Sequence, residues 1–205
     1  MQHLSLEVIA ERLGAHLHCM QDLTCRQIML AMAEAGQPLE PVHLARRLQM
    51  SQENLAAQLA RVPDTEFDTL GNIVGWGITL LPTQHRFRLQ ERTLFTWCAF
   101  DTVLFPPLLQ VEAHVQSVCE SSGQPITFVA TPEGIADILP ATSVLSLILP
   151  AERCDCVRDT FCQQSLFFQT EEAASPWMAL HPETVLLSIE EAATLGQIVA
   201  RMWPH

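Results

Sequence analysis

The chain has 205 residues, of which 48% are hydrophobic, so it can bury a core in one domain or in two small ones. Its formal charge of −12 would repel a phosphate backbone, so we expect no nucleic-acid partner. We expect no membrane partner either, because Asp101 interrupts the apolar stretch from Thr93 to Leu109 before it reaches the roughly 20 residues of a membrane-spanning helix. Since Glu7 and Glu11 break the first apolar run, we expect no secretory leader and a cytoplasmic location.

The first third of the chain has helical periodicity. Apolar residues recur at helical spacing from Leu6 to Leu17, and a second helical run extends from Cys25 to Ala35. A short helix begins at Pro41, and Ser51 is placed to cap another helix that ends near Val62. These spacings predict a helix-turn-helix.

Turn residues follow the predicted helices. Gly71-Asn72 lies between the strand-like pairs Glu66-Phe67 and Ile73-Val74, which predicts a β-hairpin. A hairpin after a helix-turn-helix is the outline of a winged helix. We therefore expect residues 1–80 to form a winged-helix-like helical lobe.

The pattern changes beyond Pro82 to short runs without repeats. We expect strands at 86–89, 126–130 and 144–149, and helices at 92–104, 152–164 and 189–202. Residues 81–205 are thus predicted to form a mixed lobe of short, mainly antiparallel strands and helices that carries the chemistry. The predicted fold class is α+β.

Cysteines are the chemically conspicuous residues. Without an export signal we expect them to be reduced thiols, which serve either as small core residues or as ligands of soft metals. Cys98 and Asp101 lie three positions apart in an apolar stretch, where a helix would place their Cβ atoms roughly 5–6 Å apart. A thiol and a carboxyl group at that separation can exchange a proton. Cys162 lies in a second aromatic-rich run.

Other groupings of cysteines are less informative. Cys119, between Val118 and Glu120, is most simply a structural thiol. Cys154 and Cys156 resemble a metal pair, but residues two apart do not share a helix face. An N-terminal cluster of one thiol and two imidazoles could bind a metal or simply be packing and surface residues; its members are Cys19, His16 and His18.

Three blocks of sequence together resemble the bacterial organomercurial (alkylmercury) lyases. These blocks are Thr65–Leu80, Trp97–Pro106 and Phe161–Phe168, and the likeness extends from about Leu39 to Gln197 in the family's order and spacing. The resemblance implies a lyase of mercury resistance and detoxification that cleaves a carbon–mercury bond by protonolysis, giving a hydrocarbon and Hg(II).

The resemblance also implies roles for individual residues. By motif the family's catalytic pair of cysteines and its aspartate fall on Cys98, Cys162 and Asp101, which would also hold mercury as substrate and product. Cys119 matches a cysteine regarded as structural. Gln163 stands where the family often has a further cysteine, and Phe67 and Trp76 replace family tyrosines.

Cofactors and partners follow from the same resemblance. We expect no resident cofactor, an organomercury compound as substrate, and an external thiol for turnover. Mercuric reductase or cellular thiols would accept the transiently bound Hg(II).

Elementary chemistry supports this interpretation. Mercury is a soft cation and prefers thiolate ligands. A second sulfur pushes electron density onto the bound carbon, which makes that carbon basic enough to be protonated. Asp101 can supply the proton, because apolar neighbours such as Phe100, Phe105 and Phe161 would raise its pKa.

Two alternatives remain open from the residues alone. A winged-helix metal-responsive regulator would use Ser51–Arg61 as its recognition helix, but Arg61 is the only basic residue there. A non-catalytic mercury-binding protein would use the same two cysteines without turnover. Asp101 distinguishes the carrier from the lyase, because only the lyase needs its proton.

Overall fold

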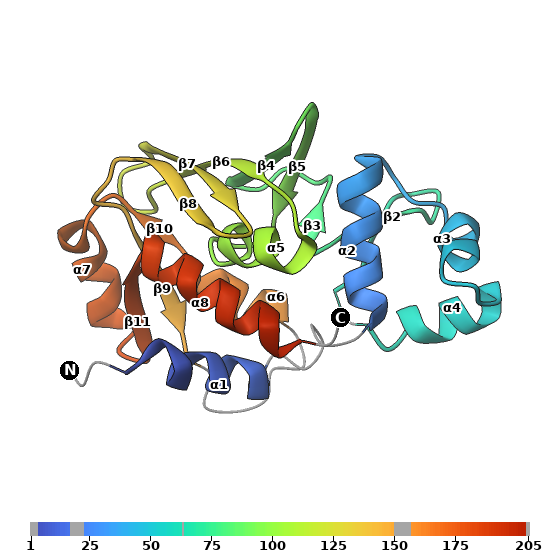
Figure 1. Ribbon diagram of the computed structural model, residues 1–205, viewed down its shortest axis with the longest axis horizontal. Coiled ribbons are helices and arrows are strands. Elements are labelled where there is room, and N and C mark those ends of the chain that lie inside the picture. Colours follow the sequence, from blue (N-terminus) through green and yellow to red (C-terminus); the bar gives the residue numbers. More distant parts are fainter. Residues whose placement is uncertain (1–3, 17–22, 63, 150–156, 204–205) are drawn as a thin grey trace.

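The computed structural model describes residues 4–16, 23–62, 64–149 and 157–203 (Figure 1). In Figure 1 the short helices after α2 lie on the right, while the smaller sheet and the long helix α8 lie to the left. The mixture of helices and antiparallel sheets confirms the predicted α+β class. Among the described residues, none of the helices combines the length and the apolar character needed to cross a membrane.

The helices differ widely in length. In chain order they are α1 (Leu6–His16), α2 (Leu23–Ala35), α3 (Pro41–Arg47), α4 (Gln52–Leu59), α5 (Asp101–Leu109), α6 (Val157–Thr160), the 3₁₀ helix η2 (Cys162–Gln164), α7 (Glu171–Leu180) and α8 (Ile189–Met202).

The strands form two antiparallel sheets. The larger has the order β1-β2-β3-β5-β4-β6-β7-β8 and the smaller the order β10-β9-β11. Their bounds are β1 (Glu66–Phe67), β2 (Ile73–Trp76), β3 (Ile78–Thr79), β4 (His85–Leu89), β5 (Arg92–Thr96), β6 (Ala113–Val118), β7 (Pro125–Thr131), β8 (Gly134–Leu139), β9 (Val144–Ile148), β10 (Phe167–Phe168) and β11 (Thr184–Ser188).

Most predicted helices and strands are present at the predicted places. The helix-turn-helix and the hairpin are α3, α4, β1 and β2, and Ser51 caps α4 by accepting a hydrogen bond from Asn54 N at 3.1 Å. The last helix, predicted at 189–202, has those bounds. Ser188 and Glu191 fix its start as a capping box, in which each side chain accepts a hydrogen bond from the other residue's backbone N–H.

The predicted helix at 92–104 is wrong. Its first part is strand β5, which pairs with both β3 and β4, and helix α5 begins only at Asp101. Thr93, Phe95 and Thr96 are β-branched or aromatic and favour a strand, while the left-handed Gln90 closes the turn from β4. Tertiary pairing therefore decides the local structure here.

The predicted helix at 152–164 is only partly tested, because residues 150–156 lie outside the described residues. The described part is two short pieces, α6 and η2, separated at Phe161. Cys162 is the first residue of η2, so it lies on a tight turn rather than on a continuous helix.

The boundary predicted at residue 80 stays a prediction. Strands β1 to β3, before that position, and strands β4 and β5, after it, belong to one sheet. Arg158 of α6 also connects the two regions: its guanidinium forms an ion pair with Glu66 of β1, and its backbone N–H donates to Asp64 Oδ2 at 3.4 Å.

Helices α5 and α8 approach each other closely. A Cβ atom added to Gly196 of α8 would lie 2.6 Å from the carbonyl oxygen of Val103 in α5. Glycine therefore allows the two backbones to touch, and α8 fixes the position of the helix that begins at Asp101. In Figure 1 the two helices lie next to each other near the centre of the molecule.

His85 lies at the junction of the two sheets. Its Nδ1 is 2.8 Å from Ser117 Oγ of β6, and its ring packs edge-on against Phe167 of β10 at 5.9 Å between centroids. Burial lowers the pKa of His85 to about 4, so this histidine is neutral in the folded protein at neutral pH.

We predict an acid-dependent loss of stability from His85. Below the unfolded-state pKa of about 6.5 the unfolded chain binds a proton that the folded chain refuses, so the free energy of unfolding falls as pH decreases toward 4. Relative to His85→Gln, the wild type should lose about 1.4 kcal/mol per pH unit between roughly pH 6 and 4.5. Urea titrations at several pH values measure this. If the difference in unfolding free energy between the wild type and His85→Gln does not change with pH, the prediction is wrong.

We also predict that Arg158→Ala costs about 2 kcal/mol of unfolding free energy, because it strands the carboxylate of Glu66, whose side chain is only 7% exposed. The matched control is Arg47→Ala, which breaks the pair with Glu34; both of these side chains are well exposed, so the loss should stay below about 1 kcal/mol. Both free energies of unfolding are measured by urea titration. Equal losses in the two variants would contradict the prediction that the ion pair of buried Glu66 contributes more to stability than the exposed pair.

Candidate active site

Cys98 lies in the turn between β5 and α5, where the chain is held on both sides. Trp97 N donates to Gly77 O at 3.1 Å, and the Thr96 hydroxyl donates to the carbonyl oxygen of Cys98 at 3.0 Å. The thiol is fully buried. These bonds fix the backbone of a residue that has no regular secondary structure of its own.

Asp101 begins α5 and faces back toward Cys98. Its Oδ2 accepts a hydrogen bond from Cys98 N at 3.2 Å, and the residue is 3% exposed. The sequence predicted this proximity from helical spacing; the proximity is real, but a turn that leads into the helix produces it. One carboxylate oxygen therefore serves a backbone N–H group, which offsets part of the cost of burial.

Cys162 comes from a distant part of the chain and completes the cluster. One oxygen of Asp101 and the sulfur atoms of Cys98 and Cys162 all lie within 4.8 Å of one another. Cys162 is 5% exposed. The three residues predicted as catalytic are thus brought together, with a donor set of two soft sulfurs and one hard oxygen.

Aromatic side chains belong to the same buried core as the two cysteines. Phe100 and Phe161 pack edge to face with ring centroids 6.1 Å apart, and Phe105 is a fully buried member of that core. Trp97 packs edge-on against Trp76 at 5.6 Å, and the guanidinium of Arg158 lies 5.3 Å from the centre of the Trp97 ring. The predicted apolar surroundings are confirmed.

Burial shifts the proton affinity of all three groups. It raises the pKa of Asp101 to about 7, against hydrogen bonds from Cys98 and Trp97 that favour the carboxylate. Burial also raises the pKa of the Cys98 thiol. The hydrogen bond shared with Cys98, and then burial, raise the pKa of Cys162 well above its ordinary value. At neutral pH both thiols are protonated and Asp101 exists in both forms.

Other predicted residues lie elsewhere. Cys119 is buried at the end of β6, where Gln169 N donates to its sulfur at 3.4 Å, and it is not part of the cluster. Cys25 is a core residue of α2. Gln163 is exposed beside Cys162. The predictions for Cys19, Cys154, Cys156 and His18, and for the side chain of His16, lie outside the described residues.

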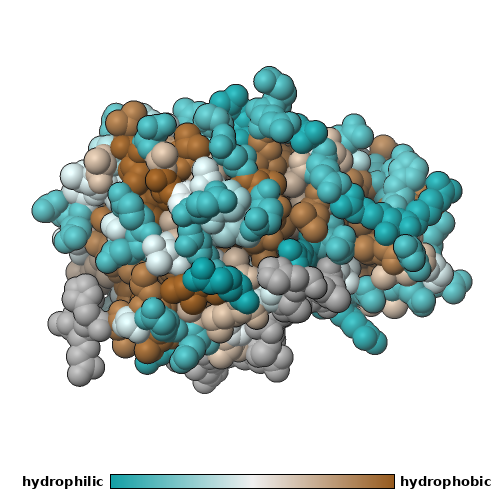
Figure 2. All heavy atoms as spheres, viewed as in Figure 1, coloured by the Kyte–Doolittle hydropathy of each residue, from teal (hydrophilic) through white to brown (hydrophobic). Residues whose placement is uncertain are grey.

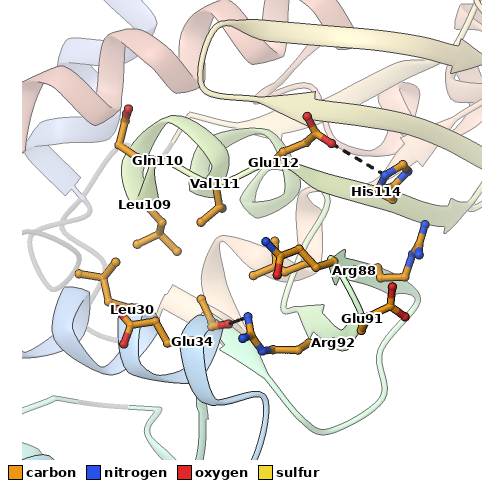
Figure 3. Close-up of a pocket in the computed structure, with 13 residues that line it drawn as sticks. Leu30, Glu34, Arg88, Glu91, Arg92, Leu109, Gln110, Val111, Glu112 and His114 are labelled. Atoms are coloured by element: carbon orange, nitrogen blue, oxygen red, sulfur yellow. Dashed lines mark hydrogen bonds and ion pairs between the residues drawn. The ribbon is translucent and has the colours of Figure 1, made fainter.

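Two hollows on the surface are separate from this cluster. Figure 3 shows one of about 750 Å³ bounded by α2, β4, β5 and β6, where His114 and Glu112 form an ion pair. An apolar groove of about 850 Å³ runs between α1, α7 and β11, in the region where Figure 2 shows hydrophobic surface at the lower left. Cys98, Asp101 and Cys162 line neither of them.

Sequence reasoning missed Ser165 and Arg158. Ser165 is fully buried, and its hydroxyl accepts a hydrogen bond from Phe100 N at 2.9 Å. The available signal was weak: Ser165 is a small hydroxyl residue three positions after Cys162, and two glutamines stand between them. Arg158, four positions before Cys162, is the only basic residue near that cysteine in the sequence.

Comparisons with known proteins agree with this geometry. A family model described as alkylmercury lyase matches residues 78–201. An alkylmercury lyase of Pseudomonas putida is 36% identical over 192 residues, which cover 94% of this chain and 90% of the relative. The alkylmercury lyase of Streptomyces lividans is 35% identical over 82% of this chain and 78% of its own length.

The fold has a counterpart among solved structures. The crystal structure of the mercury-bound form of MerB2 superimposes with a TM-score of 0.75, covering 96% of this chain and 97% of that one at 21% identity. That identity supports the shared fold, while the relatives in sequence establish the family. The chain belongs to the alkylmercury lyases, enzymes that cleave the carbon–mercury bond.

Proposed function

We propose that Cys98, Cys162 and Asp101 carry out the protonolysis of the carbon–mercury bond, with mercury held as substrate and then as product. The observation that supports this most directly is the cluster itself: two sulfurs and one carboxylate oxygen within 4.8 Å of one another, all buried. Thiolates are the preferred ligands of a soft cation, whereas a carboxylate binds it weakly and stays free to move a proton.

The first step attaches the substrate. An organomercury compound R–Hg–X exchanges its group X for one of the two sulfurs, and the thiol proton leaves with X. A single mercury–sulfur bond is stable and does not weaken the carbon–mercury bond enough for cleavage. The second sulfur must therefore reach the same mercury atom, which the short distances in the cluster permit.

The second step moves one proton. As the second sulfur bonds to mercury, its proton passes to the Asp101 carboxylate, and Asp101 then delivers it to the carbon. The electron pair of the carbon–mercury bond becomes the new carbon–hydrogen bond. The products are the hydrocarbon and Hg(II) on two thiolates, and the Asp101 carboxylate is regenerated.

The environment of Asp101 suits this role. A pKa of about 7 means that the carboxylate can take up a proton and lose it at neutral pH with little free-energy change. Burial of the three residues keeps water away from the carbon–mercury bond, so the proton passes directly between the sulfur, the carboxylate and the carbon. The same burial keeps both thiols protonated until mercury arrives, so that metal contact drives their ionisation.

Release of Hg(II) requires other thiols. Mercury on two buried thiolates is bound tightly, so external thiols must replace Cys98 and Cys162 one at a time. Small cellular thiols or mercuric reductase are our candidates for this acceptor. We propose no resident cofactor, because sulfur, carboxylate and substrate together account for every atom and proton of the reaction. The relatives are lyases, so the comparisons give no support to the regulator or carrier alternatives.

We predict that Cys98→Ala abolishes benzene release from phenylmercuric acetate in the presence of excess small thiol, lowering it at least ~1000-fold. Gas chromatography measures the benzene. The matched control is Cys25→Ala, which removes a fully buried thiol from α2, outside the cluster, and should keep most of the activity. Benzene release by Cys98→Ala at the control's rate would exclude Cys98 from the reaction.

We predict that Asp101→Asn binds phenylmercury but does not cleave it. The amide oxygen can still accept the hydrogen bond from Cys98 N, whereas the side chain has no acidic proton to give. Benzene release should fall by ~100-fold or more, while mercury remains bound after gel filtration. If turnover continues in this variant, the proton comes from another group.

A further inference from the structure

Ser165 is hydrogen-bonded to both halves of the catalytic cluster. Its backbone N–H donates to the carbonyl oxygen of Cys162 at 3.2 Å, and its carbonyl oxygen accepts from Ala99 N at 3.2 Å. Its hydroxyl oxygen accepts from Phe100 N at 2.9 Å. One fully buried residue therefore links the turn that carries Cys162 to the turn between Cys98 and Asp101.

The bond to Phe100 N meets a need of helix α5. The first N–H groups of a helix have no partner within it, and Phe100, which precedes the helix, has no side chain that could cap it. Ser165 supplies the missing acceptor from a segment 65 positions away in the chain. Because Asp101 is the next residue, this bond sets where its carboxylate lies.

We propose that Ser165 is a positioning residue of the lyase: its hydrogen bonds to Ala99, Phe100 and Cys162 hold Cys98 and Asp101 in register with Cys162. This proposal rests on the roles proposed above for the three clustered residues. Ser165 touches neither the carbon nor the departing proton, so its effect is on the rate of cleavage rather than on mercury binding.

Ser146 of β9 provides a matched control. It is also fully buried, its hydroxyl donates to Gln164 O at 3.0 Å, and it accepts from Leu166 N at 3.2 Å. It thus binds the backbone on both sides of Ser165 without being part of the catalytic cluster. Replacing either serine with alanine removes one buried hydroxyl from the same region.

The test compares the wild type with Ser165→Ala, Ser146→Ala and Ser165→Thr, using phenylmercuric acetate with excess thiol and measuring benzene by gas chromatography. We expect kcat of Ser165→Ala to fall roughly tenfold or more with KM changed by less than about threefold. Ser146→Ala should keep kcat within about threefold, although its thermal midpoint falls comparably. Ser165→Thr, which retains a hydroxyl, should recover most of the rate.

Three outcomes would overturn the proposal: wild-type kcat in Ser165→Ala, equal loss of kcat in both alanine variants, or a Ser165→Thr enzyme as slow as Ser165→Ala. The proposed chemistry is checked separately in the same assay. Benzene from the wild type and its loss in Asp101→Asn test the roles of the cluster, whereas Ser165→Ala against Ser146→Ala tests Ser165 alone.

Discussion

A carboxyl group buried between two thiols is the constraint to which the rest of this structure responds. Asp101 is 3% exposed, and a carboxylate in such surroundings is costly unless it is protonated or hydrogen-bonded. The structure uses both means: Cys98 N donates to the carboxylate, and the pKa rises to about 7. A group that is costly in the folded state is thereby ready to accept and release a proton.

Placing that group requires segments that are distant in sequence. Helix α8 packs backbone to backbone on α5 at Gly196, which fixes the helix that begins at Asp101. Ser165 joins the start of the same helix to the turn of Cys162, and Arg158 joins α6 to the first strand of the large sheet. The cluster of Cys98, Asp101 and Cys162 thus lies where helices, turns and sheet are held by short contacts, and small displacements there would separate its two sulfurs and its carboxylate.

Local sequence predicted the helices whose ends carry their own signals. The predicted cap Ser51 and the helix predicted at 189–202 are both confirmed, and in the structure a Ser188–Glu191 capping box begins that last helix. The helix predicted at 92–104 failed because pairing with β3 and β4 outweighs an apolar pattern that suits helix or strand equally well. The pairing of Cys98 with Asp101 was predicted correctly from a wrong local structure, since a turn and a helix both bring such positions close.

The contact between Cys98 and Cys162 could not follow from spacing, because 64 positions separate the two residues and no local rule relates them. Family resemblance supplied that pairing. Neither spacing nor family resemblance could identify Ser165: its hydrogen bonds with Ala99 N and Phe100 N exist only once η2 lies against the start of α5, and no spacing in the sequence encodes them. Residues that act by joining two segments become visible only in three dimensions.

Proton affinity also explains why the cluster can remain ready without reacting with the wrong partner. The thiols of Cys98 and Cys162 both have raised pKa values, so few thiolates form before mercury binds, and the thiolate is the form that oxidants and most metals attack. Mercury binds sulfur strongly enough to displace the proton from a buried thiol, whereas harder cations gain too little from sulfur to do so. The burial that suits Asp101 to the proposed proton transfer therefore also favours a soft metal at the two cysteines.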